Sequence, residues 1–547
     1  MLLILAYWLF LLIITLPFGV LLQKLCGIKS ANICLAVLFG LLFLCFGFTT
    51  ASLFTALNIY VLGIVVLIAI SLYYIYRKDI KTIFGSSMLK LKTLQPFQKY
   101  ILLFFIFAAA LKSAQVPFVI DNESYYIQTI KWANEFGLLK GLANLHIFLA
   151  QASPWHILHA GLNLNFTGLS FNDINGFIFL VTLTYAITKQ EALKSWLGLL
   201  PMLSVFYFMF LDAPSPDLPL LCIIPCMLWL YTQNKVDNFK AALLLFAFAV
   251  FIKVTVAPLA LLFLQQLIRK KHFAFFSIVG LSVFILWVVK NIIVSGYPLY
   301  PLTILSVDAD WKVPAEILNT INTTADKNVY GTAAGAGMSE KLISWFTMSG
   351  MKGLLNKAIV LLLVIMPFLK TIRLHPTYRL AYGAILAQFV ILLLISPQFR
   401  FFLPVVVFLL LLLAYRVYEA IDNRYWAYKI AVSAGALAAV ILITNINYGG
   451  VTNNRFHQAS AGFRFSQLYI PEPVTRYPDI GYNKLKSGNM EYYSPSQNFF
   501  LYGTANGPLP CVNSAQLRYF ERKTGYIPQL RNDNAIESGF KSVKTLR

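Results

Sequence analysis

Long apolar runs separated by short basic segments dominate the chain. A helix needs about 20 apolar residues to cross the hydrocarbon core of a bilayer. Fourteen runs approach this length: 2–22, 32–53, 57–76, 100–117, 173–188, 195–211, 217–233, 239–254, 256–268, 273–294, 355–370, 379–396, 400–415 and 428–447. The pair at 239–254 and 256–268 is short enough to be re-entrant. The pattern therefore predicts an all-α polytopic membrane protein with 12 to 14 transmembrane helices.

The composition agrees with this class. Of 547 residues, 59% are hydrophobic and only 12% are charged, which excludes a soluble protein of this size. The net charge of +22 comes from lysines and arginines between the apolar runs, and no basic stripe with interleaved aromatics occurs. Because such a stripe marks nucleic-acid binding, we expect no nucleic-acid partner. The six cysteines form neither a CxxC motif nor a disulfide framework.

The basic connections predict the orientation in the membrane. Seven connections carry lysine or arginine, and all seven fall on one side if the fourteen spans are correct. The cytoplasmic side of a membrane protein carries the excess of basic residues. The opposite side, the periplasm of a bacterium, then holds both termini and the loops 118–170 and 295–354. The basic residues are Lys24 and Lys29; Arg77, Lys78, Lys81, Lys90, Lys92 and Lys99; Lys189 and Lys194; Lys235 and Lys240; Arg269, Lys270 and Lys271; Lys370, Arg373 and Arg379; Arg416, Arg424 and Lys429.

The chain divides into a transmembrane domain, 1–447, and a C-terminal region, 448–547. The C-terminal region has strand-like and turn-like pieces rich in Tyr, Phe, Asn, Gly and Pro, which predict a small α/β cap on the mouth of the bundle. GTAAGAG at 331–337 lacks the Lys-Ser/Thr of a P-loop and indicates a flexible linker. The chain has no internal repeat, which disfavours an inverted-repeat transporter.

The first large outer loop gathers titratable residues. DNESYYIQTIKWANEF, from Asp121, places Tyr126, Ile130, Ala133 and Phe136 on one helical face, which predicts an amphipathic helix on the membrane surface. The simpler interpretation of the polar start is an N-cap at Asp121 or Asn122, with Glu123 favouring the helix dipole. A catalytic role for these acids is the alternative, and both interpretations can hold together.

Three histidines in the same loop have simpler explanations than catalysis. His146 is typical of a satisfied loop histidine. His156 and His159 are three residues apart, but no third ligand follows in register, so packing is a better explanation than a metal site.

Several charged residues lie near the outer ends of predicted spans: Asp121, Glu123, Lys112, Asp212, Asp217, Lys253, Lys290 and Arg400. Charges buried in a membrane are costly and tend to pair or to line a cavity. They form either an ion-pair network or a phosphate site, in which cations hold a phosphate leaving group while a carboxylate takes a proton.

Three of these charges have both a structural and a functional interpretation. Arg400 follows Pro397 and Gln398, where a guanidinium can anchor the span or bind phosphate through two hydrogen bonds. Lys253 can extend its amine to the interface. Asp217, in SPDLP, is explained as the N-cap of the following span.

The architecture resembles the GT-C superfamily of glycosyltransferases, whose bundles carry an acidic motif in the first large outer loop, a helix after it and a soluble tail. Five segments are also similar to a bacterial family of large multispan membrane proteins. They are DNESYYIQTIKWANEFGLLKGLANLH at 121–146, APSPDLPL at 213–220, FIKVTVAPLALL at 251–262, NIIVSGYPLYP at 291–301 and SPQFRFFLP at 396–404.

The GT-C resemblance implies transfer of a sugar from a polyprenyl-phosphate donor to a lipid, glycan or protein acceptor at the outer face of the bacterial inner membrane. It implies that Asp121 acts as catalytic base or helps to hold a divalent cation such as Mg²⁺ or Mn²⁺. Glu123 is the second catalytic candidate, although Asn122 separates the two acids where many members have adjacent ones. The expected phosphate-binding residues are Lys253, Arg400 and Lys290, and the expected substrate-binding residues are Tyr125, Tyr126, His146, Trp155, Asp217 and Gln398.

Three alternatives stay open. A polysaccharide polymerase or ligase would also use lipid-linked glycans, but such enzymes rely on arginines in a large outer loop, and 295–354 contains none. A lipid or solute transporter would carry charges along a pathway through the midplane. A structural membrane subunit would leave Asp121, Lys253 and Arg400 far apart. Whether these three residues meet in one cavity separates the alternatives best.

Overall fold

The computed structural model covers residues 1–547. It describes all of them except 170, 189–194, 234, 269–271, 333–334, 445–461, 497, 533–534 and 546–547. Two predicted basic connections therefore lie outside the described residues: the pair Lys189 and Lys194, and the run Arg269, Lys270 and Lys271.

The described chain is mostly helical, as the hydrophobic pattern predicted. Its long apolar helices are α1 (Leu2–Leu25), α2 (Ile33–Ser52), α3 (Ile59–Ile75), α5 (Pro96–Ser113), α9 (Ile174–Thr188), α11 (Asp217–Thr232), α12 (Val236–Ile252), α14 (Phe273–Ser295), α17 (Gly350–Ile365), α19 (Pro376–Ile395), α20 (Phe399–Glu419) and α21 (Arg424–Ile443). Shorter pieces are η5 (Trp196–Leu203) with α10 (Ser204–Phe208), and η6 (Val254–Ala260) with α13 (Leu261–Ile268).

Among the described residues, eight helices are long and apolar enough to cross a membrane. The helix α3 and the next helix, α4 (Arg77–Lys92), are bent by 84° and make a ninth if they form one span. Each of the fourteen predicted ranges contains helix. A membrane protein is therefore the class that the structure supports, whereas the count of fourteen stays a prediction.

Local signals explain where several helices begin. The side chain of Asn32 accepts a hydrogen bond from Leu35 N at 3.1 Å and caps α2. Asn58 accepts from Tyr60 N at 3.1 Å and caps α3. Pro96 opens α5, where a missing N–H leaves no helical hydrogen bond unmade. These caps satisfy donors that a helix start would otherwise leave unpaired near the membrane.

The helices α1 and α2 pack backbone to backbone. A Cβ on Gly19 would lie 1.7 Å from the carbonyl oxygen of Ala36, and a Cβ on Gly40 would lie 1.9 Å from that of Thr15. Only glycine fits at such distances, and small residues of this kind let membrane helices approach closely.

Basic connections meet at one end of the bundle. Residues 77–92 form the helix α4 rather than the loop that the sequence predicted. Lys24 Nζ lies 2.6 Å from Asp79 Oδ1 of α4, and Lys240 Nζ donates to Cys26 O at 2.9 Å. Three predicted connections on the same side are therefore in contact.

The first outer loop folds into short helices: the π-helix η1 (Asn122–Tyr126), α6 (Ile127–Glu135), α7 (Leu142–Leu145), η2 (Ile147–Gln151) and α8 (Pro154–Leu162). The prediction of an amphipathic helix on the membrane surface is wrong for α6. All its residues except Lys131 and Glu135 are buried in the protein. Gln128 Nε2 donates to Gly507 O at 3.0 Å on one side, and Asn134 Nδ2 donates to Ala160 O at 2.7 Å on the other.

The second outer loop contains the helices α15 (Ala315–Tyr330) and α16 (Met338–Thr347). The segment 331–337, predicted as a flexible linker, is the connection between them. Within that connection, residues 333–334 lie outside the described part of the chain. Trp345 of α16 is buried and donates from Nε1 to Pro397 O at 2.9 Å, which joins this loop to the start of α20.

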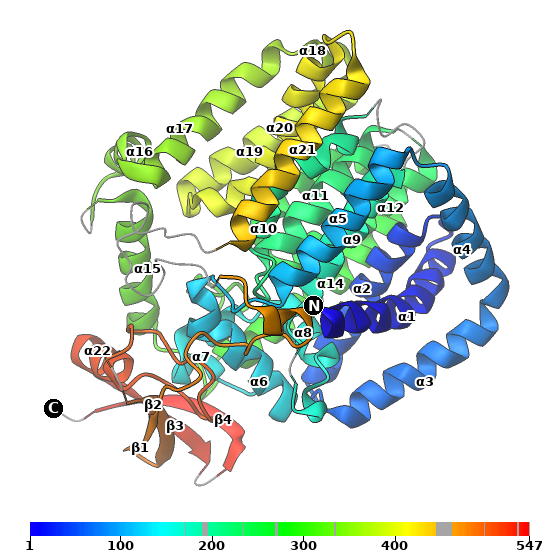
Figure 1. The fold of residues 1–547 in the computed structure, drawn as a ribbon. Helices are drawn as coiled ribbons and strands as arrows, with labels where there is room; N and C mark the ends of the chain where they lie inside the picture. The colour runs from blue at the N-terminus through cyan, green and yellow to red at the C-terminus, as the bar shows by residue number, and fades with distance from the viewer. Residues whose placement is uncertain are drawn as a thin grey trace.

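The C-terminal region, described from residue 462, forms two antiparallel hairpins and a helix. The elements are β1 (Tyr482–Ser487) paired with β2 (Met490–Pro495), α22 (Ser514–Thr524), and β3 (Tyr526–Asn532) paired with β4 (Ala535–Lys544). Figure 1 shows this region beside α7 and α15, at the opposite end of the bundle from α18 (Lys370–Leu374). The predicted small α/β region is therefore present.

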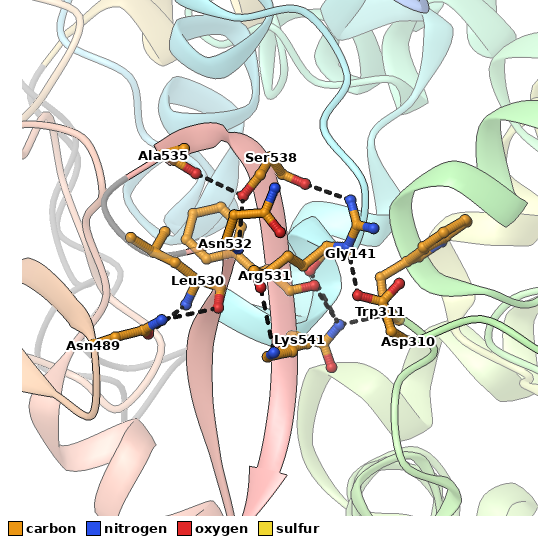
Figure 2. A network of polar contacts seen from close by, with 12 residues as sticks. Gly141, Asp310, Trp311, Asn489, Leu530, Arg531, Asn532, Ala535, Ser538 and Lys541 are labelled. Atoms are coloured by element: carbon orange, nitrogen blue, oxygen red, sulfur yellow. Dashed lines mark hydrogen bonds and ion pairs between the residues drawn. The ribbon is translucent and has the colours of Figure 1, made fainter.

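Polar contacts fix the C-terminal region to both outer loops (Figure 2). Arg531 Nε lies 2.8 Å from Asp310 Oδ2, and Phe540 N donates to Lys140 O at 2.9 Å. Gly141 and the hairpin approach so closely that a Cβ on Gly141 would lie 2.0 Å from Phe540 O. The amino terminus lies at the same end, since Leu3 N donates to Tyr469 O at 3.4 Å.

The glycine contact between α1 and α2 yields a stability prediction. Gly40→Ala should lower the apparent melting temperature of the detergent-purified protein by several degrees, because the helices must separate. Overpacking of this kind costs about 1–3 kcal/mol, which exceeds the gain of about 1 kcal/mol in helix propensity. Gly47→Ala in the same helix is the control, since nothing lies within 4 Å of its added Cβ. Equal melting temperatures for the two variants would contradict the close approach.

Candidate functional site

Four charged residues from distant parts of the chain form one ion-pair network. Arg400 Nη1 lies 2.8 Å from Asp121 Oδ2 and 4.0 Å from Asp217 Oδ2. Lys253 Nζ bonds to the other oxygen of Asp217. Asp121 precedes η1, Asp217 opens α11, Lys253 follows α12 and Arg400 lies in the first turn of α20. The structure thus brings together three residues whose meeting the sequence left open.

The position of Arg400 follows from the entry to α20. Gln398 is extended and precedes the helix, and its Oε1 accepts a hydrogen bond from Arg400 Nε at 2.9 Å. Gln398 Nε2 in turn donates to Ser396 Oγ at 3.2 Å. The predicted substrate ligand Gln398 therefore orients the guanidinium from behind, while Nη1 faces Asp121.

Lys253 lies where the helical backbone breaks. Its φ of −156° and ψ of 117° are extended, between α12 and the 3₁₀ helix η6. The amine lies over the Phe401 ring, 4.4 Å from its centroid, and the Arg400 guanidinium carbon lies 5.5 Å from the same centroid. Phe401 thus supports both cations, a role that the sequence analysis missed because the residue reads as one more apolar position in a span.

Asp217 is held by the turn before α11. It is the first residue of that helix, whereas Pro216 occupies the N-cap position that the sequence assigned to Asp217. Its N–H donates to Ser215 Oγ at 3.3 Å, and its carboxylate faces the two cations instead of capping the helix. The N-cap prediction is therefore wrong, because a buried carboxylate with two cations in reach gains more from pairing.

A buried asparagine holds the same turn. Asn175 Nδ2 donates to Ala213 O at 2.6 Å and to Ser215 O at 3.0 Å. Trp155 Nε1 donates to Asn175 Oδ1 at 2.7 Å. The predicted substrate-binding residue Trp155 is fully buried, so it supports the turn rather than facing the ion pairs. The sequence marks Asn175 only as a single amide side chain at the start of an apolar run.

The two ion pairs differ in their access to solvent. The side chains of Asp217 and Lys253 are 5% and 19% exposed, and those of Asp121 and Arg400 are 25% and 33% exposed. We call the first the inner pair and the second the outer pair. The inner pair is shielded from water, while the outer pair lies at the accessible edge of the network.

Aromatic rings from the first loop line this network. The Tyr126 and His156 ring centroids are 4.6 Å apart, and Tyr125 lies 6.0 Å from His156. Burial raises the pKa of Tyr125, and the nearby Asp121 carboxylate raises it further. Burial also lowers the pKa of His156 to about 3, so this ring is neutral. Tyr125 and Tyr126 therefore lie near enough to Asp121, Asp217 and Arg400 to feel their charges, while their predicted role in substrate binding stays a prediction.

Lys290 is outside the network. Its amine is buried and donates to Ala152 O at 2.8 Å, just before α8. Its charge is among the causes that lower the pKa of His156. The ion pairs form without Lys290. Its predicted contact with phosphate therefore stays a prediction.

Glu123 faces away from Asp121. Thr475 Oγ1 donates to Glu123 Oε2 at 2.6 Å, and Arg476 N and Asn122 Nδ2 donate to Oε1 at 2.9 Å and 3.1 Å. Thr504 N also donates to the Glu123 carbonyl oxygen at 2.9 Å. Burial raises the pKa of this carboxyl. The second acid of the motif binds the C-terminal region instead of joining the ion pairs.

His146 also faces the C-terminal region. Nδ1 accepts from Phe148 N at 3.3 Å, so the proton lies on Nε2, which is 3.2 Å from Tyr502 O. Burial lowers the pKa of His146 to about 4. The structure therefore places His146 as a neutral link between the first loop and residue 502.

A separate ion pair, between Lys112 and Asp212, lies outside the ion-pair network. Lys112 Nζ is 2.7 Å from Asp212 Oδ2, with side chains only 4% and 0% exposed. Lys112 also donates to Gln115 Oε1 at 3.0 Å, and Gln115 Nε2 donates to Ile443 O at 2.7 Å. Because it is sealed from solvent, this pair joins α5, the 211–217 turn and α21 rather than forming a site.

A divalent cation near Asp121 stays a prediction. The described residues contain no group of three His, Cys, Asp or Glu side chains that could hold a metal ion. The two nearest carboxylates, Asp121 and Asp217, already face Arg400. This donor set does not fit a divalent cation as arranged.

The link through His146 makes stability depend on pH. Its pKa is about 4 in the fold and about 6.5 when unfolded. Between these values the unfolded chain binds the extra proton, so stability falls as the pH drops from about 6.5 to about 4, by at most about 3 kcal/mol. His146→Gln, which keeps a donor for Tyr502 O, should show a smaller loss of melting temperature between pH 7.5 and pH 5. The matched control is His375→Gln at an exposed position; identical pH profiles for all three proteins would contradict a buried neutral His146.

Comparison with known proteins gives a family but no activity. A family model described as a domain of unknown function (DUF8201) matches residues 1–408. No curated protein and no solved structure matches the chain. The matched range contains all four residues of the ion-pair network and excludes the C-terminal region. Because the match spans 408 of the 547 residues, the chain belongs to the DUF8201 family.

Proposed function

We propose that this protein is a GT-C-type membrane glycosyltransferase, which moves a sugar from a polyprenyl-phosphate donor to a lipid, glycan or protein acceptor. The observation that carries the proposal is the ion-pair network. Asp121 and Arg400 are 279 positions apart in sequence, yet they meet beside Asp217 and Lys253. A structural subunit has no need to assemble two carboxylates and two cations with one pair accessible to solvent.

The proposed topology has fourteen spans in the inner membrane of a bacterium, with the site at the periplasmic face. Lys24, Lys240 and α4 meet at one end of the bundle. By the positive-inside rule, this end is cytoplasmic. The ion-pair network lies with the C-terminal region and the amino terminus at the other end. All charges of the network lie at that one depth, whereas a transporter would need charges along a pathway through the midplane.

In the proposed reaction, Asp121 accepts the proton of an acceptor hydroxyl. The hydroxyl oxygen attacks the anomeric carbon of the sugar, and a new carbon–oxygen bond forms with inversion. The bond between that carbon and the phosphate oxygen breaks, and its electron pair leaves with polyprenyl phosphate. Arg400 and Lys253 neutralise the charge that develops on the phosphate, and water later removes the proton from Asp121.

The aromatic residues complete the proposed site. Tyr125 is 7% exposed and adjoins Asp121, so its ring can cover the sugar while Tyr126 packs behind it on His156. Asp217 holds both cations in place and has no role of its own in proton transfer.

The proposal predicts that Asp121→Asn loses transfer. Removal of a general base costs about 100-fold to 10,000-fold in rate. The measurement is transfer of labelled sugar from polyprenyl-phosphate sugars by the purified full-length protein in detergent or nanodiscs. Asp79→Asn is the control, because it removes an ion-paired carboxylate at the opposite end of the bundle.

Both variants should elute and melt like the wild type. Full transfer activity in Asp121→Asn would end the assignment of Asp121 as base. A ladder of products from one acceptor would instead favour a polysaccharide polymerase, because a single transfer yields one product.

A further inference from the structure

We infer that Arg400 exchanges partners during catalysis, so that the donor phosphate displaces Asp121 from the guanidinium and thereby frees the base. The inference rests on the proposed function for the identity of the ligand. We infer the following order of events. Arg400 holds the Asp121 carboxylate until a phosphate binds, and the carboxylate then accepts the proton.

Chemical likeness between the two anions supports the exchange. Carboxylate and phosphate both present oxygens at a spacing that a guanidinium can bind through two parallel hydrogen bonds. In the structure, Asp121 Oδ2 lies 2.8 Å from Arg400 Nη1, where a phosphate oxygen would bind. Asp121 therefore occupies the position on the guanidinium that a phosphate oxygen would take.

Burial determines which pair opens. The side chains of the outer pair, Asp121 and Arg400, are 25% and 33% exposed, so water screens their attraction more than that of the inner pair. The inner pair has its carboxylate 5% exposed, and separation would leave a buried charge alone. An incoming anion therefore replaces the outer pair and leaves the inner pair intact.

The remaining contacts keep Arg400 in place after the exchange. Three contacts of Arg400 do not involve Asp121: Gln398 Oε1 accepts from Nε at 2.9 Å, the Phe401 ring centroid lies 5.5 Å from the guanidinium carbon, and Asp217 Oδ2 lies 4.0 Å from Nη1. The guanidinium therefore presents a fixed edge to either anion. Lys253, held by Asp217, is the second cation for the phosphate.

The exchange links donor binding to base activity. While Asp121 Oδ2 accepts a hydrogen bond from Arg400, that oxygen is engaged with the guanidinium. Once phosphate takes the guanidinium, this oxygen is released beside the donor that carries the anomeric carbon. An acceptor that arrives before the donor finds this oxygen of Asp121 still bound to Arg400.

The test is binding of farnesyl phosphate, a short prenyl phosphate, to the full-length protein in detergent, measured by calorimetry or thermophoresis. Asp121→Asn removes the competing anion and should tighten binding about two- to fivefold, the range expected for loss of a partly exposed ion pair. Arg400→Gln should weaken binding at least about tenfold, since a charged hydrogen-bond partner of the phosphate is lost.

Two further variants separate exchange from a general gain of positive charge. Asp79→Asn makes the same change in net charge at the far end of the bundle and should leave the affinity unchanged. Asp217→Asn makes the same change in net charge inside the network. It should not tighten binding, because Lys253 and Arg400 lose the carboxylate that positions them. Tightening in Asp217→Asn equal to that in Asp121→Asn would overturn the exchange.

The outcomes also separate this inference from the proposed function. If Asp121→Asn loses transfer but binds farnesyl phosphate like the wild type, the function stands and the exchange fails. If Asp121→Asn binds more tightly and retains transfer, the anion site is real and Asp121 is not the base. If the wild type shows no saturable binding that Arg400→Gln abolishes, the exchange fails as well.

Discussion

The ion pairs around Asp217 are the constraint on which the rest of the site depends. A carboxylate that is 5% exposed is costly unless cations approach it, and here Lys253 and Arg400 do so from two different helices. The local backbone makes this approach possible: α12 ends just before Lys253, and α20 begins at Phe399, directly before Arg400. These helix ends place both cations within reach of Asp217.

Neutral contacts carry the second layer of support. Asn175 binds two carbonyls of the turn before α11, Trp155 binds Asn175, and Trp345 binds the carbonyl of Pro397 before α20. In each contact a side-chain N–H donates to a backbone or amide oxygen. Membrane lipid offers no hydrogen-bond donor to such an oxygen. The positions of Asp217 and Arg400 thus depend on buried amides and indoles as much as on their own charges.

The hydrophobic pattern predicted the helices because a run of about 20 apolar residues has few other solutions in lipid. The same reasoning predicted Asp121, Lys253 and Arg400 as candidates, since charges at span ends carry a cost. Side-chain direction was beyond prediction. Asp121 and Glu123 flank the start of a π-helix, and their partners, Arg400 and Thr475, lie hundreds of residues away. The burial of α6 likewise depends on the C-terminal region, which a helical periodicity cannot reveal.

Asp121 and Glu123 face different partners, and this difference explains how the acidic motif connects two parts of the structure. Asp121 reaches the accessible outer pair, while Glu123 and His146 bind the C-terminal region at Thr475 and Tyr502. The start of η1 therefore links the ion-pair network to the C-terminal region through adjacent residues. Asn122, which follows Asp121, donates to both Glu123 Oε1 and Val474 O and so binds the backbone next to Asp121 to the C-terminal region. The C-terminal region accordingly acts as a structural support of the network, although it lies outside the range that defines the family.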